Sequence, residues 1–417
     1  MVRVLTVALL VGTAGLTANA AEIVPGHAAS VGVDVGYVDV SAYSSWTEGS
    51  AGKLRYGDSG FTLNRAFIDY RGRWTDTLHA NIVLEAYDDD IGNAIDFTQA
   101  YLEWRPVPGT ATRYRAKLGA FYPPISLENV DAAWSSPYTA SSSAINSWIA
   151  EEIRTLGAEL AVTRRPASLG GAHAFSIEVA AFQGNDPAGS LLAWKGWSVH
   201  DRQSRFNDEL PLPPLPQIQP GMMFEKQDPW VAPFREVDGR TGYYTNVEWR
   251  YAEKLLLRTG CYDNRADPTA IEDGQYAWYT EFTHAGLQTT FPGAIGLVAQ
   301  WMTGATVMGP RMYSNGAHAV DAEYESYFAL LSKAYGRHRW SFRYDNFAVS
   351  QSDQTPQDNN AESGHASTLA YQVGLAEKLS LVAEWISIKT HRPAWSYFAL
   401  APGEVETQFQ LTLRLRL

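Results

Sequence analysis

The feature that most constrains this chain is the regular alternation of apolar and polar side chains in its last thirteen residues, 405–417. One face carries Val405, Phe409, Leu411, Leu413, Leu415 and Leu417, with Thr407 as its only polar member. The other face carries charged and amide side chains such as Glu406 and Arg414. Successive side chains of a strand point to opposite sides of a sheet. The segment therefore predicts a strand with one apolar wall and one polar wall.

The first twenty residues have the pattern of a signal peptide. Arg3 is the only charge, an apolar run covers residues 4–16, and Ala18-Asn19-Ala20 offers a cleavage site between small residues. We expect residues 1–20 to direct export and residues 21–417 to form the mature protein. No later stretch approaches about 18 uncharged apolar residues, so any membrane crossing would use strands.

Sixteen segments after residue 20 fit a strand template, most of them near the length of a tilted transmembrane strand. They cover residues 31–43, 61–74, 76–86, 96–105, 112–120, 153–163, 172–182, 241–251, 254–262, 276–290, 294–302, 321–333, 338–349, 364–376, 378–388 and 405–417.

Short connections alternate with long ones along the whole series. Turn formers such as Pro108-Gly109 and Pro292-Gly293 mark the short connections, whereas the long ones reach 32 and 58 residues at 121–152 and 183–240. Outer-membrane barrels sort their connections in this way, and a β-sandwich has no reason to do so. We therefore predict an all-β fold, a transmembrane antiparallel barrel of about 16 strands with short periplasmic turns and long extracellular loops, in the outer membrane of a Gram-negative cell.

The composition agrees with a barrel surrounded by lipid, because 14 Trp and 22 Tyr could supply aromatic girdles at the two interfaces. The terminal strand would present the chain to the barrel-assembly machinery. A large exported carbohydrate-binding or adhesion protein also uses many aromatic residues and stays open as an alternative. That alternative predicts solubility without detergent.

No motif in the chain indicates catalysis. G-x-S-x-G, H-E-x-x-H, P-loop and CxxC patterns are absent, and the histidines lack metal-ligand spacing. Asp88-Asp89-Asp90 fits a solvated acidic loop better than a cation site. Cys261 is the only cysteine and cannot form an intramolecular disulfide. We predict neither an enzyme nor a metal or cofactor site, and the net charge of −12 argues against nucleic acid as a partner.

Basic side chains on the polar faces of the strands indicate a lumen that attracts anions. The candidate pore-lining and anion-binding residues are Arg65, Arg71, Arg73, Arg113, Arg115, Lys117, Arg339, Arg343, Arg414 and Arg416. Nearly all lie close to a short turn or to the carboxyl terminus, so they predict a basic inner vestibule below acidic outer loops. Acids such as Asp69, Glu85 and Glu159 share these faces, so a lining of mixed charge and a modest anion preference both stay open.

Two long loops stand out. Residues 121–152 form the third long loop, which we expect to fold into the lumen and narrow it, with Pro123, Pro124, Glu128 and Asp131 as candidate constriction residues. Residues 183–240 contain a stiff proline-rich stretch at 210–216. This second loop is either a plug, a cap or a partner-binding arm, or an ordered surface loop.

Four segments in the first third of the chain resemble the phosphate-selective porin O and P family. They are Asn-Arg-Ala-Phe-Ile-Asp-Tyr-Arg-Gly at 64–72, Phe-Thr-Gln-Ala-Tyr-Leu-Glu-Trp at 97–104, the segment from Lys117 to Glu128, and Arg-Thr-Leu-Gly-Ala-Glu-Leu at 154–160. The resemblance implies a sixteen-stranded outer-membrane porin, commonly a homotrimer, that passes anions by diffusion. In this chain the third long loop carries Glu128 and Asp131 but no Lys or Arg.

We therefore expect a passive diffusion channel for small hydrophilic solutes with a weak preference for anions such as phosphate or carboxylate. A substrate-specific outer-membrane channel for a sugar, a carboxylate or an aromatic compound is the alternative within transport. In that case Trp134, Tyr138 and Trp148 would contact the solute.

Overall fold

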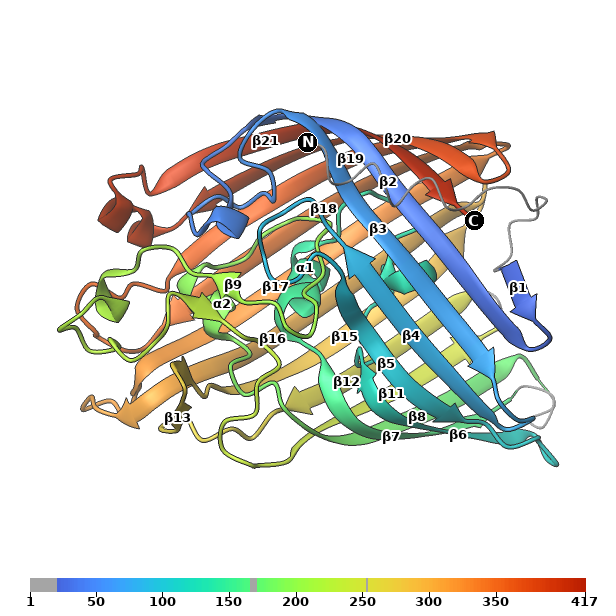
Figure 1. The fold of residues 1–417 in the computed structure, drawn as a ribbon, viewed down its shortest axis with the longest axis horizontal. Coiled ribbons are helices and arrows are strands. Elements are labelled where there is room, and N and C mark those ends of the chain that lie inside the picture. Colours follow the sequence, from blue (N-terminus) through green and yellow to red (C-terminus); the bar gives the residue numbers. More distant parts are fainter. Residues whose placement is uncertain (1–20, 166–170, 253) are drawn as a thin grey trace.

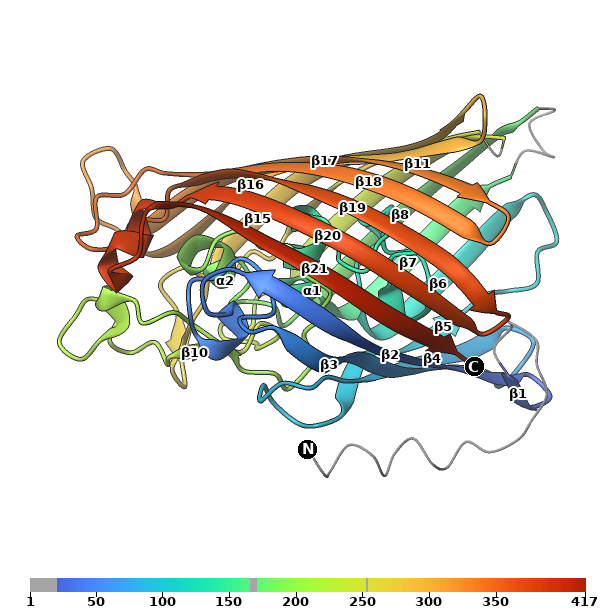
Figure 2. The same ribbon diagram turned by 90° about the horizontal axis from the view of Figure 1, so that it is seen from above.

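Sixteen antiparallel strands pair in chain order and close into a barrel (Figures 1 and 2). The computed structural model describes residues 21–165, 171–252 and 254–417. The barrel strands are β2 (His27–Ser41), β3 (Gly60–Arg73), β4 (Leu78–Ala86), β5 (Asp96–Trp104), β6 (Thr112–Phe121), β7 (Thr155–Arg164), β8 (His173–Gln183), β11 (Gly242–Tyr251), β12 (Leu255–Asp263), β15 (Tyr279–Phe291), β16 (Ile295–Arg311), β17 (His318–Tyr335), β18 (His338–Gln351), β19 (Glu362–Ala376), β20 (Leu379–His391) and β21 (Gly403–Arg416). The last strand pairs with the first, from Gly32 opposite Arg416 to Ser41 opposite Thr407, and this pairing closes the ring.

All sixteen predicted strands are present, so the predicted fold class is confirmed. One strand is much longer than expected, because β16 continues to Arg311 and leaves only residues 312–317 as the loop predicted at 303–320. The chain also has a short strand β1 (Ala21–Val24) paired with the start of β2, and two small loop hairpins, β9 (Leu210–Pro211) with β10 (Trp230–Val231) and β13 (Ile271–Glu272) with β14 (Gln275–Tyr276). The predicted signal peptide, residues 1–20, lies outside the described residues.

Every barrel strand has an inner and an outer face. On β17, Ser326, Phe328 and Leu330 point inward and are buried, whereas Tyr327 and Leu331 point outward and are exposed. The alternation of polar and apolar residues in the sequence thus corresponds to side chains that point alternately into the bore and toward the exterior.

The two ends of the barrel differ. The short turns, such as residues 105–111 and 292–294, lie at one end, which we call the short-turn end, and Leu417 lies there too, paired with Val31 (Figure 1). The long connections lie at the other end, the loop end. This arrangement confirms that short and long connections alternate between the two ends, except that residues 312–317 at the loop end form a short connection. Within the described ranges, no helix combines the length and the hydropathy needed to cross a bilayer.

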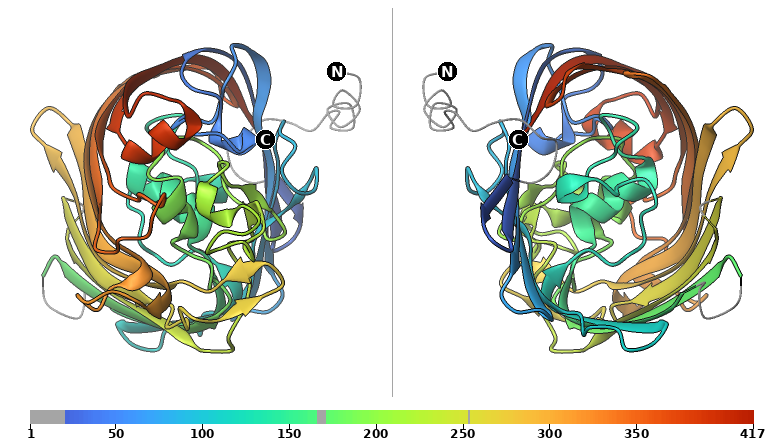
Figure 3. Two further views of the ribbon diagram at one scale, coloured as in Figure 1. Left: turned by 90° about the vertical axis from the view of Figure 1, so that its left-hand side faces the viewer. Right: turned by 90° about the vertical axis from the view of Figure 1, so that its right-hand side faces the viewer.

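The barrel wall is uneven in height. Strands β4 and β5 have nine residues each, whereas β16 and β17 have 17 and 18. The bore is not empty, because two loops enter it and carry the helices α1 (Ala144–Glu152) and α2 (Ser190–Trp194) (Figure 3).

Candidate functional site

The loop between β6 and β7, residues 122–154, folds into the bore (Figure 3). It ends in α1, whose N-terminal cap is Ser143, and every residue of α1 is buried. The Trp148 ring packs against Trp197, Phe282 of β15 and Tyr324 of β17, with ring centroids 5.9, 5.5 and 5.2 Å away. This inserted loop therefore fills the part of the bore next to β15–β17 with a packed apolar core.

The long loop between β8 and β11, residues 184–241, docks on the inserted loop. Residues 184–200 are all buried, so the interpretation of this stretch as an ordered surface loop is wrong. The Glu152 carboxylate accepts hydrogen bonds from the N–H groups of Leu191 and Leu192 at 3.0 and 3.2 Å and from the Ser190 hydroxyl at 3.1 Å. Because Gly189 offers no side-chain cap, Glu152 satisfies the free N–H groups at the start of α2.

Buried ion pairs hold the loops to one another. Glu151 pairs with Lys195 at 2.5 Å and with His200 at 2.6 Å. Burial alone would raise the pKa of Glu151, but the Lys195 ammonium and the His200 ring hold the pKa down to about 2. Asp89 pairs with Arg202 at 2.7 Å and is mostly buried, so the expectation of a solvated acidic loop is wrong for Asp89.

Residues 129–142 of the inserted loop form a strap across the bore. The strap has little regular structure, so its main-chain groups need partners from the barrel wall. Glu384 of β20 accepts the N–H groups of Ala140 and Ser141 at 2.6 and 3.0 Å. Arg343 of β18 donates to the carbonyls of Ser141 and Ser142 at 2.8 and 2.9 Å. Charged side chains of two strands thus anchor the carboxyl-terminal half of the strap.

The amino-terminal half of the strap contains two consecutive residues in the left-handed region of backbone conformation, Ala133 with φ 49° and Trp134 with φ 54°. Left-handed backbone is unfavourable for residues other than glycine and persists only where surrounding contacts hold it. Arg65 of β3 and Gln203 of the long loop both donate to the Ala133 carbonyl. Arg65 also pairs with Glu85 at 2.5 Å.

A polar gap remains between the strap and the wall. Wall residues around it are Asp34 of β2, Asn64 and Arg65 of β3, and Thr412 and Arg414 of β21; the strap contributes Asn129, Trp134, Ser135 and Ser136, and the long loop contributes Asp201 and Gln203. The free space is about 20 Å³, enough for roughly one water molecule.

Two larger hollows, of about 450 and 340 Å³, open at the short-turn end. The arginines that line them are Arg71, Arg73, Arg105, Arg113, Arg115 and Arg165. Arg71 pairs with Asp69 at 2.8 Å, and Arg115 pairs with Glu159 and Glu178 at 3.0 and 2.8 Å. Arg73 and Arg113 are exposed, and within the described parts of the chain neither takes part in an ion pair. We call this region the basic vestibule.

The predicted basic residues thus fall into separate groups. Arg71, Arg73, Arg113 and Arg115 line the vestibule, and Lys117 lies beside it, paired with Glu159 at 3.3 Å. Arg65 and Arg414 border the polar gap. The remaining three are engaged elsewhere: Arg416 pairs with Asp34, Arg339 donates to the Ser332 hydroxyl, and Arg343 is fully buried.

The predicted constriction residues also have different positions. Pro123 and Pro124 follow the end of β6 directly, at the start of the inserted loop. Glu128 is buried and pairs with Arg343 at 2.7 Å, while Asp131 caps the 3₁₀ helix η2 (Ala132–Trp134). Sequence reasoning did not select Asp34, Asn64, Asn129 or Thr412. Strand alternation was a usable signal for Asp34 and Thr412, which point inward, but no pattern marks Asn129 on its loop.

The three aromatic residues proposed as solute contacts differ in access. Trp148 is 1% exposed inside the packed core, so it cannot contact a solute. Trp134 borders the polar gap and stacks on Tyr122 at 4.1 Å. Tyr138 lies beneath the Arg339 guanidinium at 5.5 Å.

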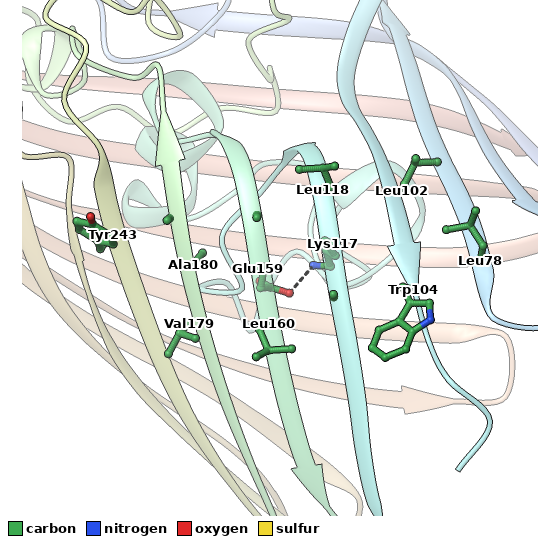
Figure 4. Close-up of a pocket in the computed structure, with 13 residues that line it drawn as sticks. Leu78, Leu102, Trp104, Lys117, Leu118, Glu159, Leu160, Val179, Ala180 and Tyr243 are labelled. Carbon is green, nitrogen blue, oxygen red and sulfur yellow. Dashed lines mark ion pairs between the residues drawn. The ribbon is translucent and has the colours of Figure 1, made fainter. Parts of the chain in front are cut away.

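The outer face of strands β4 to β8, which we call the low wall, carries an apolar hollow of about 710 Å³ (Figure 4). Leu78, Leu102, Trp104, Leu118, Leu160 and Val179 surround it. The outward Ala116, Ala158 and Ala181 leave it concave. The Lys117–Glu159 ion pair lies behind it, on the inner face of the same strands.

Solved structures share this fold. The structure is similar to OmpF of Salmonella typhi in complex with daunomycin (TM-score 0.54, 9% identity, 94% of this chain and 97% of that chain). It is also similar to the outer-membrane channel DcaP of Acinetobacter baumannii (TM-score 0.53, 10% identity, 96% of this chain and 100% of that chain). A third similar structure is an anion-selective porin from Comamonas acidovorans (TM-score 0.51, 15% identity, 94% of this chain and 99% of that chain). No family model and no curated protein matches the sequence. The chain therefore has the fold of an outer-membrane porin.

Proposed function

We propose that this chain is an outer-membrane porin through which small hydrophilic solutes diffuse passively. The observation that carries the proposal is the closed barrel with an apolar exterior and a charged interior. Exposed outward side chains include Ile68, Leu102, Leu118, Ile177, Val247 and Leu331. A continuous apolar belt of this kind is stable in lipid, and a barrel has no unpaired strand edge there.

An aromatic girdle at the short-turn end supports the membrane location. Exposed aromatic side chains at the strand ends there are Trp74, Trp104, Tyr114, Tyr251, Phe291, Tyr335 and Trp340. Amphipathic rings favour the level of the lipid headgroups. The short-turn end then faces the periplasm and the loop end faces the outside. A soluble adhesion protein would leave both the belt and the girdle in water.

The finer proposal is a weak preference for anions, supported by the basic vestibule. Arg113 lines the 450 Å³ hollow and Arg73 the 340 Å³ hollow, and among the described residues neither guanidinium has a paired carboxylate. Fixed charge of one sign in a water-filled mouth raises the local concentration of counter-ions. The resemblance of the first third of the chain to the phosphate-selective porin O and P family adds support. The planar fork of Arg suits phosphate and carboxylate groups.

Conductance in planar bilayers under a potassium chloride gradient tests both parts. We expect an ohmic channel whose reversal potential is displaced toward that of chloride. The double variant Arg73→Gln/Arg113→Gln should shift the reversal potential toward potassium, because two unpaired cations leave the vestibule. Arg337→Gln, on the turn between β17 and β18, should leave the reversal potential unchanged. A strong potassium preference of the unmodified channel contradicts the anion preference, and the absence of any conductance contradicts the porin function.

The apolar hollow on the low wall supports self-association, and we propose a homotrimer with a second copy of this chain as the occupant. In lipid, association is driven by van der Waals packing rather than by loss of apolar surface from water, so concave surfaces with small residues are favoured. Ala116, Ala158 and Ala181 give the low wall such a surface.

A further inference from the structure

The route of a solute is restricted by the packed core inside the barrel. Trp148 and Trp197 fill the bore next to β15, β17 and β18 together with Phe282, Tyr324 and Phe347. These rings have no exposed surface for water or solute, since Trp197 is 0% and Trp148 1% exposed. On the side of β2, β3 and β21, by contrast, polar side chains face the strap across the polar gap. The gap is therefore the place where a hydrophilic solute would pass the strap.

Within the part of the chain that the structure describes, several buried polar atoms around the gap have no hydrogen-bond partner. The donors are Nε of Arg65 and Nε of Arg414; the acceptors are Oδ1 of Asn64 and Oδ1 of Asn129; the Thr412 hydroxyl can act as either. All five side chains belong to residues that are more than nine-tenths buried. Buried polar groups are rarely left unpaired, so this concentration at one gap indicates a ligand or water that completes them.

The chemistry of these unpaired atoms restricts the ligand. Two guanidinium N–H groups require acceptors, whereas two amide oxygens require donors. A hydroxyl group both donates and accepts, so a solute with several neighbouring hydroxyls can meet all of them. A bare anion offers only acceptors and would leave both amide oxygens unpaired.

The fixed charges point in the same direction. Arg65 and Arg414 line the gap together with Asp34 and Asp201, and the two aspartates also pair with Arg416 and Arg55 outside it. Charges of both signs therefore face the gap and are already held in ion pairs, so a simple ion of either sign gains little there. From this geometry we propose that the polar gap is a selectivity site for small polyhydroxylated solutes, with Asn64, Asn129, Thr412, Arg65 and Arg414 as its specificity-determining residues; the inference rests on the proposed porin function.

Passage of such a solute requires the strap to move, because about 20 Å³ holds only one water molecule. The left-handed pair Ala133-Trp134 lies at the edge of the gap and is held there by Arg65 and Gln203. Strained backbone at a narrow point is a suitable place for a short displacement. The Ala133 carbonyl accepts from Nη2 of Arg65, so a displacement of the strap would free Nη2, beside the unpaired Nε, to donate to solute hydroxyls.

The test uses the whole protein in planar bilayers, with xylitol as the probe and potassium chloride as the current carrier. We expect xylitol to reduce the current with saturation at a measurable midpoint concentration. Thr412→Val should raise that midpoint about threefold or more, the value expected for one lost hydrogen bond. This substitution removes no hydrogen bond of the unliganded protein, since the Thr412 hydroxyl has no partner. Arg414→Lys keeps the charge, removes the Nε donor and should act in the same direction.

Thr390→Val is the matched control. Thr390 is also a buried inward threonine with an unpaired hydroxyl, but it lies on β20 and not at the gap. The xylitol concentration that gives half of the maximal block should be the same for Thr390→Val as for the unmodified protein. Current that falls only with the viscosity of the xylitol solution, or equal midpoints for Thr412→Val and Thr390→Val, would overturn the site. Loss of all chloride and potassium current would instead overturn the porin function itself.

Discussion

Arg343 illustrates how a side chain that points into the bore can anchor a loop rather than contact a solute. It is fully buried and binds Glu128, Asp345 and the carbonyls of the strap. Arg113, on another inward face, is exposed and has no ion pair with any described residue. Strand alternation predicted the inward direction of both arginines. It could not predict their different roles, because Glu128 lies 215 positions from Arg343 and no local pattern connects the two.

At this scale we predict that Arg343→Met releases the strap. The change leaves the Glu128 and Asp345 carboxylates buried and without their cation, which costs about 3–5 kcal/mol when a buried pair is broken. We expect faster hydrogen exchange in residues 129–142 and a larger, noisier single-channel conductance. Arg250→Met on β11 is the control, because Arg250 pairs with Glu248 and, among the described residues, forms no ion pair with the strap. Equal exchange in both variants would show that Arg343 does not anchor the strap.

Strands and loops differ in how far the sequence predicts them. A strand of the wall has a period-two pattern that can be read locally, and all sixteen were found. The end of β16 was missed, and Gly304 lies just beyond the predicted end at residue 302. A Cβ at Gly304 would lie 2.1 Å from the Glu281 carbonyl oxygen and 2.7 Å from the Tyr324 hydroxyl, so glycine here allows close approach of the neighbouring strands. Helix α1 was missed because its nine residues are stabilised by burial on all sides and carry no amphipathic pattern.

For the loop assembly we predict a loss of stability in acid. The pKa of Glu151 is about 2 in the folded protein and 4.5 for an unperturbed glutamate. A lowered pKa stabilises the folded loops above pH 4.5, and this contribution, on the order of 3 kcal/mol, is lost as the pH falls from 4.5 toward 2. We expect protease cleavage within residues 184–241 to rise across that range.

Glu151→Gln isolates this effect. Without the carboxylate, Lys195 and His200 lose their partner, so the loop should already be cleaved faster at neutral pH. The rate at which protease cleaves the Glu151→Gln variant should then change less between pH 4.5 and 2 than the rate for the unmodified protein. An acid response of the same size in both proteins would assign the transition to other groups.

The molecule as a whole combines a tall wall with a low wall. The tall wall, from β15 to β18, carries the packed core of the inserted loop, and the low wall, from β4 to β8, carries the outer hollow. Sequence reasoning predicted oligomerisation only through family resemblance. Outward apolar residues look alike all around a barrel in lipid, so the alternation cannot distinguish a wall that faces lipid from one that faces another protomer. The concavity left by Ala116, Ala158 and Ala181 becomes visible only when the strands are placed side by side.

Leu160→Arg on the low wall should therefore separate the protomers, while Leu331→Arg on the tall wall should not. The two leucines are matched, since both point outward and are 45% and 43% exposed. An outward arginine is unfavourable in lipid at either position, so contact with lipid penalises both variants. Only Leu160 would also place a charge in the packed contact between copies. Native mass spectrometry in detergent should give trimers for the unmodified protein and for Leu331→Arg, and single chains for Leu160→Arg. Single chains for the unmodified protein, or trimers for both variants, would mean that the low wall faces lipid.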